Sequence, residues 1–239
     1  MAASHSWELR FYRFLRVKPL CNIFFKIRYI WFVLILRRLK SFENLDHVDG
    51  HQHNSKGILH ARPSDRILKL IMPLSIIDSL NVNSKILAIG CRYETDLLYL
   101  ASHGFSISNI RGLDLLSYSP WIDLGNMHNM SYEDNTWDAV MMGWVLTYSK
   151  DPKKAVAEII RVTRPKGIVA IGITTYPEKY IAEQVDEGTL PVEYETLNRI
   201  NSTSDILMLF GNHVDKIYFQ HDRSNKEKQG PCLIVFSLN

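Results

Sequence analysis

Apolar and polar positions follow two different spacings from residue 64 to the end of the chain. Short apolar runs predict buried strands, and apolar residues three or four positions apart predict amphipathic helices. Strands are expected within residues 85–90, 110–115, 137–148 and 167–174, and helices within residues 64–80, 95–104, 151–167 and 202–211. Strands that alternate with helices favour a doubly wound α/β fold with a mostly parallel sheet covered on both faces.

Individual residues set the expected limits of these helices. Ser64 is a candidate N-cap, Pro73 predicts a kink, and Gly104 predicts a helix end. Pro152 suits a first helical turn, and residues 165–167 predict the end of the helix that it begins.

The last third of the chain departs from the regular alternation. Residues 175–201 follow no simple pattern and are expected to shape a pocket for a substrate. Two apolar runs, 213–220 and 231–238, are joined by a polar loop and predict a C-terminal antiparallel hairpin.

Residues 1–40 combine apolar bulk with many basic side chains. Their longest uninterrupted apolar run covers residues 29–36, whereas a helix that crosses a membrane needs ~20 apolar residues. Pro19 is expected to interrupt the first helix. Apolar bulk beside cationic side chains is typical of a helix that lies in a membrane interface. A helical cap packed on the domain and a targeting peptide are the alternatives.

A polar stretch over residues 41–63 predicts a linker between this N-terminal segment and a domain over residues 64–239. The stretch contains "HQH" at residues 51–53, but no Cys or acidic cluster stands at ligand spacing, so no metal site is predicted.

Charge is distributed unevenly along the chain. Residues 1–40 contain nine Lys or Arg and one acid, which gives a net charge of +8, and the remaining 19 basic and 24 acidic residues give −5. The globular part therefore lacks the basic footprint of a nucleic-acid-binding protein. Three cysteines far apart in the sequence suit a reducing, cytoplasmic location, with possible membrane association through the first 40 residues.

Three motifs in sequence order resemble class I S-adenosylmethionine-dependent methyltransferases of the small-molecule type 11 kind. "AIGCRYE" stands where the family has an acid followed by Gly-x-Gly-x-Gly, so that Gly90 is kept and Arg92 and Glu94 replace the later glycines. "GNMHNMSYEDNTWDAV" resembles the family's adenine loop, and "EIIRVTRPKGIVAI" resembles its helix-to-strand passage. The resemblance covers roughly residues 85–174 and implies a Rossmann-like fold and S-adenosyl-L-methionine as the cofactor.

The resemblance assigns cofactor-binding roles to particular residues. Asp114 matches the acid that binds the ribose hydroxyls, Asn126 stands where an Asp meets the adenine amino group, and Met127 packs on the ring. Gly90 supplies the close turn that the cofactor needs. Arg92 is predicted to bind the methionine carboxylate, unless its side chain points to solvent or pairs with Glu94.

Aromatic residues after the fourth strand are the remaining candidates. Trp144 and Tyr148 are expected to flank the sulfonium, because an aromatic face attracts a cation, or else to be core residues. Tyr148, Tyr176 and Tyr180 are candidates for substrate binding. No catalytic base is identified, since His128 is expected to have a packing or hydrogen-bonding role.

These observations predict methyl transfer to a small-molecule acceptor, or to a lipid- or glycan-linked acceptor, at a membrane surface. The alternative is a non-catalytic methyltransferase-fold protein that binds or scaffolds, for which the degenerate glycine loop is the argument. An enzyme that uses the same fold with another nucleotide-like ligand is a third hypothesis.

Overall fold

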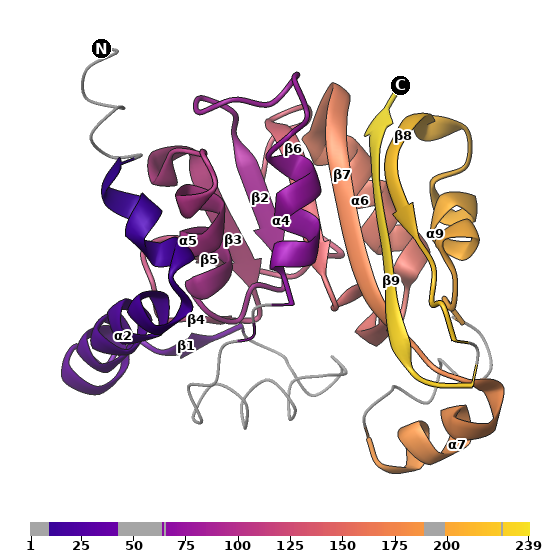
Figure 1. Ribbon diagram of the computed structural model, residues 1–239, viewed down its shortest axis with the longest axis horizontal. Coiled ribbons are helices and arrows are strands. Elements are labelled where there is room, and N and C mark those ends of the chain that lie inside the picture. The colour runs from indigo at the N-terminus through magenta and orange to yellow at the C-terminus, as the bar shows by residue number, and fades with distance from the viewer. Residues whose placement is uncertain (1–9, 43–63, 65, 189–198, 226) are drawn as a thin grey trace.

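A computed structural model describes residues 10–42, 64, 66–188, 199–225 and 227–239. The predicted linker over residues 41–63 falls almost entirely outside this part of the chain, as do the "HQH" histidines. A seven-stranded sheet forms the centre of the described structure (Figure 1).

The order of the strands confirms the doubly wound prediction. Across the sheet they run β5 (Ile122–Leu124), β3 (Ile110–Asp114), β2 (Ile86–Ile89), β6 (Trp137–Gly143), β7 (Thr163–Thr175), β9 (Gly230–Leu238) and β8 (Val214–His221). The first five are parallel, and β9 is antiparallel to both of its neighbours. The C-terminal antiparallel hairpin is therefore also confirmed.

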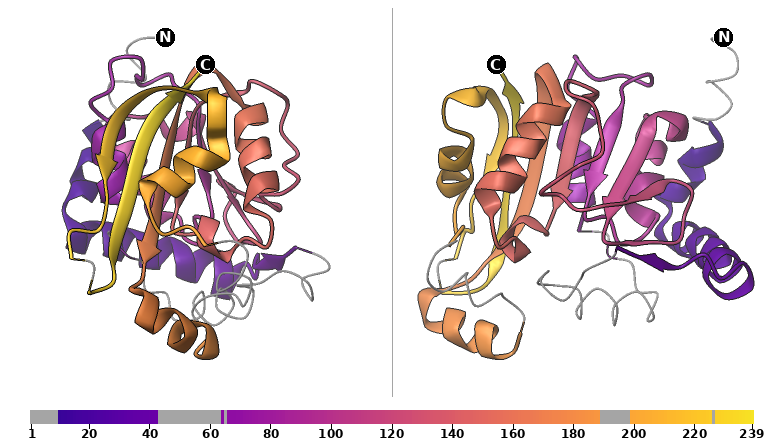
Figure 2. Two further views of the ribbon diagram at one scale, coloured as in Figure 1. Left: turned by 90° about the vertical axis from the view of Figure 1, so that its right-hand side faces the viewer. Right: turned by 180° about the vertical axis from the view of Figure 1, so that it is seen from behind.

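Helices cover both faces of the sheet (Figure 2). One face carries α4 (Leu68–Leu74) and α5 (Thr95–Ser102), and the other carries α6 (Pro152–Val162) and α9 (Thr203–Phe210). Successive side chains of β2 enter opposite cores, because strand side chains alternate between faces. Ile86 and Ala88 belong to one apolar cluster, and Leu87 and Ile89 belong to the other.

The N-terminal extension is helical, as predicted, and it packs on the domain beside α5. It consists of a 3₁₀ turn η1 (Arg13–Arg16), helix α2 (Lys18–Tyr29) and a π-helical stretch η2 (Ile30–Ile35). Pro19 lies in the first turn of α2, so it separates η1 from α2. The side chains of Leu15, Cys21, Phe25 and Tyr29 are buried in the core cluster that includes α5. A short strand β1 (Lys40–Ser41) then pairs with β4 (Leu116–Ser117).

Two predicted helices are shorter than their sequence patterns suggested. Helix α4 begins at Leu68 with Ile67 as N-cap, so the prediction of Ser64 as the cap was wrong, although the Ser64 hydroxyl accepts from the Arg66 N–H at 3.3 Å. Pro73, where a kink was predicted, lies inside the helix one residue before it ends. Proline has no N–H, so Pro73 cannot donate to the Lys69 carbonyl, and the helix lacks that hydrogen bond.

Helix α6 ends five residues before Gly167, so the prediction that residues 165–167 end it was wrong. Thr163 already belongs to β7 and pairs with Trp137 of β6. Pairing with a neighbouring strand thus extends β7 backwards over residues whose local pattern suggested helix. The irregular span over residues 175–201 contains α7 (Glu178–Asp186), which the sequence pattern did not predict.

Candidate functional site

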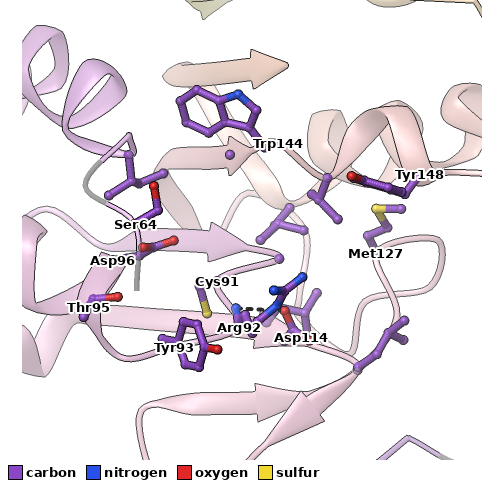
Figure 3. A pocket seen from close by; sticks show the side chains of 18 of the residues that line it. Ser64, Cys91, Arg92, Tyr93, Thr95, Asp96, Asp114, Met127, Trp144 and Tyr148 are labelled. Atoms are coloured by element: carbon purple, nitrogen blue, oxygen red, sulfur yellow. Dashed lines mark hydrogen bonds between the residues drawn. The ribbon is translucent and has the colours of Figure 1, made fainter. Parts of the chain in front are cut away.

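A pocket of about 170 Å³ lies at the carboxyl ends of β2, β3 and β6 (Figure 3). Ligands of open α/β sheets bind at this edge, where the connections leave the strands. All six predicted cofactor residues line the pocket, together with Tyr148: Gly90, Arg92, Asp114, Asn126, Met127 and Trp144. Residues from four separate loops are therefore brought together around one cavity.

Gly90 forms the tight turn after β2. Its φ is +72°, and its N–H donates to the Leu113 carbonyl at 2.8 Å. A Cβ at this position would lie 2.7 Å from the Val145 side chain, so a larger residue would force the loops apart. The one retained glycine of the motif is thus required by both backbone conformation and packing.

Asp114 ends β3 with its carboxylate held by the backbone. Its Oδ2 accepts from the Arg92 N–H and its Oδ1 accepts from the Leu116 N–H, both at 3.0 Å. The residue is 5% exposed, and burial raises the pKa of its carboxyl group. Each carboxylate oxygen has two acceptor sites, so both can accept a further bond from a ligand in the pocket.

The side chain of Arg92 lies beside Asp114 in the pocket (Figure 3). Its positive charge opposes the effect of burial on the pKa values of both Asp114 and Asp96. Glu94 turns to the other side of the loop and forms an ion pair with Arg28. The structure therefore places Arg92 at the cavity and gives Glu94 a different partner.

Asn126 and His128 organise the loop that follows β5. The Asn126 Oδ1 accepts from the backbone N–H of His128 at 2.9 Å and lies 2.8 Å from its Nδ1. The other ring nitrogen of His128 lies 2.6 Å from the Ser149 hydroxyl, and burial lowers the pKa of the imidazole. His128 thus has the hydrogen-bonding role that the sequence suggested, and the amide nitrogen of Asn126 remains as its donor.

Trp144 follows β6 in a conformation that is rare for a bulky residue. Its φ is +61°, and its N–H donates to the Gly172 carbonyl at 2.6 Å. The guanidinium carbon of Arg66 lies 4.8 Å from the centre of its ring. A non-glycine residue in this region costs on the order of 1–3 kcal/mol, and such residues cluster at ligand sites.

Three polar residues that the sequence did not single out also face the pocket: Arg66, Thr95 and Asp96. Burial raises the pKa of Asp96 to about 8, with Asp114 adding to the shift and Arg66 and Arg92 opposing it. The Thr95 hydroxyl is buried without a hydrogen-bond partner in the described chain. The sequence analysis assigned no role to the side chains of this helix start. The Thr-Asp pair in its first turn was the available signal.

Only one of the three predicted substrate residues lies at the pocket. Tyr148 lines the pocket, whereas Tyr176 and Tyr180 do not. Tyr176 is buried against Ile181 of α7, and Tyr180 is 41% exposed on the same helix.

Within the described residues, no helix has the length and apolarity needed to cross a membrane. The same residues contain no cluster of three or more His, Cys, Asp or Glu side chains that suits a metal ion.

Comparison with known proteins agrees with this geometry. A family model described as a methyltransferase domain matches residues 87–171, which include the loop at Gly90, Asp114 and the loop at Asn126 and Met127. A demethylmenaquinone methyltransferase of Symbiobacterium thermophilum is 29% identical over 111 residues, 45% of this chain and 42% of that protein. The chain thus spans less than half the length of the curated relatives it matches.

Solved structures share the fold at low identity. A geranyl diphosphate C-methyltransferase from Streptomyces coelicolor A3(2) has a TM-score of 0.56 and 11% identity, with coverage of 82% of this chain and 86% of that one. The [4+2]-cyclase SpnF has a TM-score of 0.52 and 15% identity, covering 82% and 85% of the two chains. The resemblance to class I methyltransferases is confirmed at the level of the fold and the family model.

Proposed function

We propose that this chain is an S-adenosylmethionine-dependent methyltransferase. The observation that carries the proposal is the convergence of Gly90, Asp114 and the loop at Asn126 and Met127 on one pocket at the ligand-binding edge of the sheet. The match of the methyltransferase family model over the same residues supports it, as do solved neighbours that are complexes with S-adenosylmethionine or S-adenosylhomocysteine.

The polar groups around the cavity suit the parts of this cofactor. Asp114 has acceptor capacity for the ribose hydroxyls, and Met127 offers an apolar surface for the adenine ring. Since the carbonyl of Asn126 is used within its own loop, its amide nitrogen suits an acceptor on the ring edge instead of the adenine amino group.

Charged side chains at the other end suit the zwitterionic methionine moiety. Arg66 and Arg92 are cations for the carboxylate. Asp96 holds a proton at neutral pH in the ligand-free protein, and the positive ammonium group would favour its ionised form on binding. The unpartnered Thr95 hydroxyl adds a polar contact there. An Arg-lined site with one acid matches a ligand that carries both charges.

When bound, S-adenosylmethionine would supply a sulfonium methyl group for a nucleophilic atom of the acceptor and would leave as S-adenosylhomocysteine. The chain contributes alignment, which lowers the barrier by fixing the two reactants in place. The ring of Trp144 and the phenol of Tyr148 line the pocket and would offer aromatic groups to a cationic centre bound there.

The acceptor is a small molecule, or a lipid- or glycan-linked intermediate, presented at a cytoplasmic membrane surface. The demethylmenaquinone methyltransferase among the relatives supports a small-molecule acceptor. The N-terminal extension supports the membrane part, because its outer face exposes apolar side chains beside an excess of basic residues.

Calorimetry with S-adenosylhomocysteine tests the cofactor directly. We expect micromolar affinity for the full chain, and we expect Asp114→Ala to weaken it by roughly 1 to 3 kcal/mol, the scale of lost charged hydrogen bonds. The exposed Asp78, which lies outside the pocket, provides the control Asp78→Asn. Absence of both heat and thermal shift at millimolar ligand would favour the non-catalytic alternative.

A further inference from the structure

Glu94, which stands in place of the last glycine of the motif, is completely buried on the side of the loop that faces away from the pocket. Its carboxylate forms a two-pronged ion pair with Arg28 of α2, with Nε to Oε2 at 2.6 Å and Nη2 to Oε1 at 2.8 Å. The Ser119 hydroxyl also donates to this carboxylate, and the Glu94 N–H donates to the Tyr118 hydroxyl at 3.1 Å. Glu94 thus fixes the end of the proposed cofactor loop, residues 90–94, through both its side chain and its backbone.

Arg28 is itself held tightly by aromatic rings. Its guanidinium carbon lies 3.8 Å from the centre of the Trp121 ring and 5.0 Å from that of Phe32. Its side chain is 21% exposed, and that of Glu94 is 0% exposed. Low exposure strengthens the attraction between the two charges, and it also makes loss of either partner costly.

Further contacts join the same helix to the loop. The ring of Phe25 meets the ring of Tyr93 edge-on at 5.3 Å, and Tyr29 meets Tyr118 at 5.5 Å. Tyr93 and Thr95 line the pocket on either side of Glu94. Movement of Glu94 would therefore displace two pocket residues and the helix start that follows them.

We propose that Arg28 is a positioning residue for the cofactor loop, so that the N-terminal extension is a working part of the cofactor site. Here Arg92 and Glu94 replace two glycines. Arg28 fixes the loop through Glu94, on the side that faces away from the pocket. This inference rests on the proposed function for the identity of the ligand.

The test compares Arg28→Met with Lys26→Met in the full chain. Both substitutions remove one positive charge from α2, but Lys26 is exposed and makes no ion pair with a described residue. We expect Arg28→Met to weaken S-adenosylhomocysteine binding at least tenfold in calorimetry. We expect Lys26→Met to bind as the wild type does, and Arg28→Lys to recover part of the loss.

Amide hydrogen exchange of the ligand-free proteins separates a positioning role from general destabilisation. Arg28→Met should lose protection at the Arg92 and Glu94 amides, which donate to Asp114 and Tyr118, while strands β6 and β7 keep theirs. Arg28→Lys provides the same measurement if the Met variant does not fold. Equal exchange at the loop in wild type and variant would overturn the proposal. Failure of the wild type to bind ligand would instead contradict the proposed function.

Discussion

Arg92 puts a cation at a position where the methyltransferases it resembles have glycine. Its side chain lies at the cavity beside Asp114, and its backbone N–H donates to the same carboxylate. We expect Arg92→Ala to weaken S-adenosylhomocysteine binding at least tenfold, ~1.4 kcal/mol, because a contact to the methionine carboxylate is lost.

The companion variant Arg92→Gly distinguishes a ligand contact from an obstruction. If the side chain obstructs the cavity, the glycine variant binds more tightly than wild type in the same calorimetric titration. Unchanged affinity in both variants would show that the guanidinium has no part in binding.

Asp96 makes the stability of the ligand-free protein depend on pH. Burial raises the pKa of this carboxyl group from 3.8 to about 8, with Arg66 and Arg92 opposing the shift and Asp114 adding to it. Between these two pKa values the folded state therefore holds a proton that the unfolded state has released. The contribution of Asp96 to the free energy of unfolding is largest below about pH 4 and falls as the pH rises toward 8.

Asp96→Asn removes this titration and leaves a neutral side chain of similar size. We expect the melting temperature of wild type to fall relative to that of Asp96→Asn as the pH rises from 5 to 8, measured by differential scanning calorimetry without ligand. Parallel curves for the two proteins across this range would contradict the assignment.

At the residue scale, part of the site was predictable from sequence, because some of its residues lie where the strands end. Gly90 and Asp114 come at the ends of two apolar runs, and parallel strands bring such ends to one edge. Two contacts were not predictable from sequence: the contact of Arg66 with the Trp144 ring, and the ion pair between Glu94 and Arg28. Each joins residues that are far apart in the sequence. Local periodicity contains no information on such pairs.

At the scale of elements, side chains near the end of α6 hold the loop at Met130 and Tyr132 in a clamp of hydrogen bonds. Arg161 donates to the carbonyls of Tyr132 at 2.7 Å and Met130 at 2.9 Å, and it pairs with Glu158. The Glu158 carboxylate accepts from the Met130 N–H at 2.6 Å. The Glu-x-x-Arg part of the sequence motif is thus explained by loop anchoring.

Loss of this clamp should destabilise the fold. We expect Arg161→Met to lower the free energy of unfolding by roughly 1 to 3 kcal/mol in urea titration, since several hydrogen bonds to a charged group disappear. Lys153→Met is the matched control, because Lys153 is exposed on the same helix. A similar small change in both variants would show that the clamp contributes little.

The same helix shows where sequence patterns fail at this scale. Apolar spacing located α6 correctly, because Ala155, Ile159 and Val162 share its buried face. Its end was misplaced, because Thr163 pairs with Trp137 of β6. Pairing between strands depends on the neighbouring strand and is absent from the local sequence.

At the scale of the whole molecule, the N-terminal extension has two faces with different environments. The inner face contributes Leu15, Phe25 and Arg28 to the core and the cofactor loop. The outer face exposes a row of large apolar side chains: Leu20, Ile23, Ile27, Ile30, Trp31, Leu34 and Ile35. Deletion of residues 1–40 would therefore remove core packing as well as any anchor, and it is expected to lower the melting temperature.

Point variants on the outer face test membrane binding without disturbing the inner one. Ile23 is 56% exposed and Ile27 is 63% exposed, so Ile23→Asp with Ile27→Asp should leave the fold intact. We expect the wild-type chain to float with anionic vesicles and the double variant to float far less, because the apolar contact with the acyl boundary is lost. Met208→Asp is the control for an exposed apolar residue elsewhere, because Met208 of α9 is 72% exposed.

Salt should weaken the electrostatic part of membrane binding, since the Debye length falls from ~10 Å at 0.1 M to ~3 Å at 1 M. Equal flotation of wild type and double variant would exclude this face as the anchor, and equal flotation with neutral and anionic lipid would exclude a role for the basic residues.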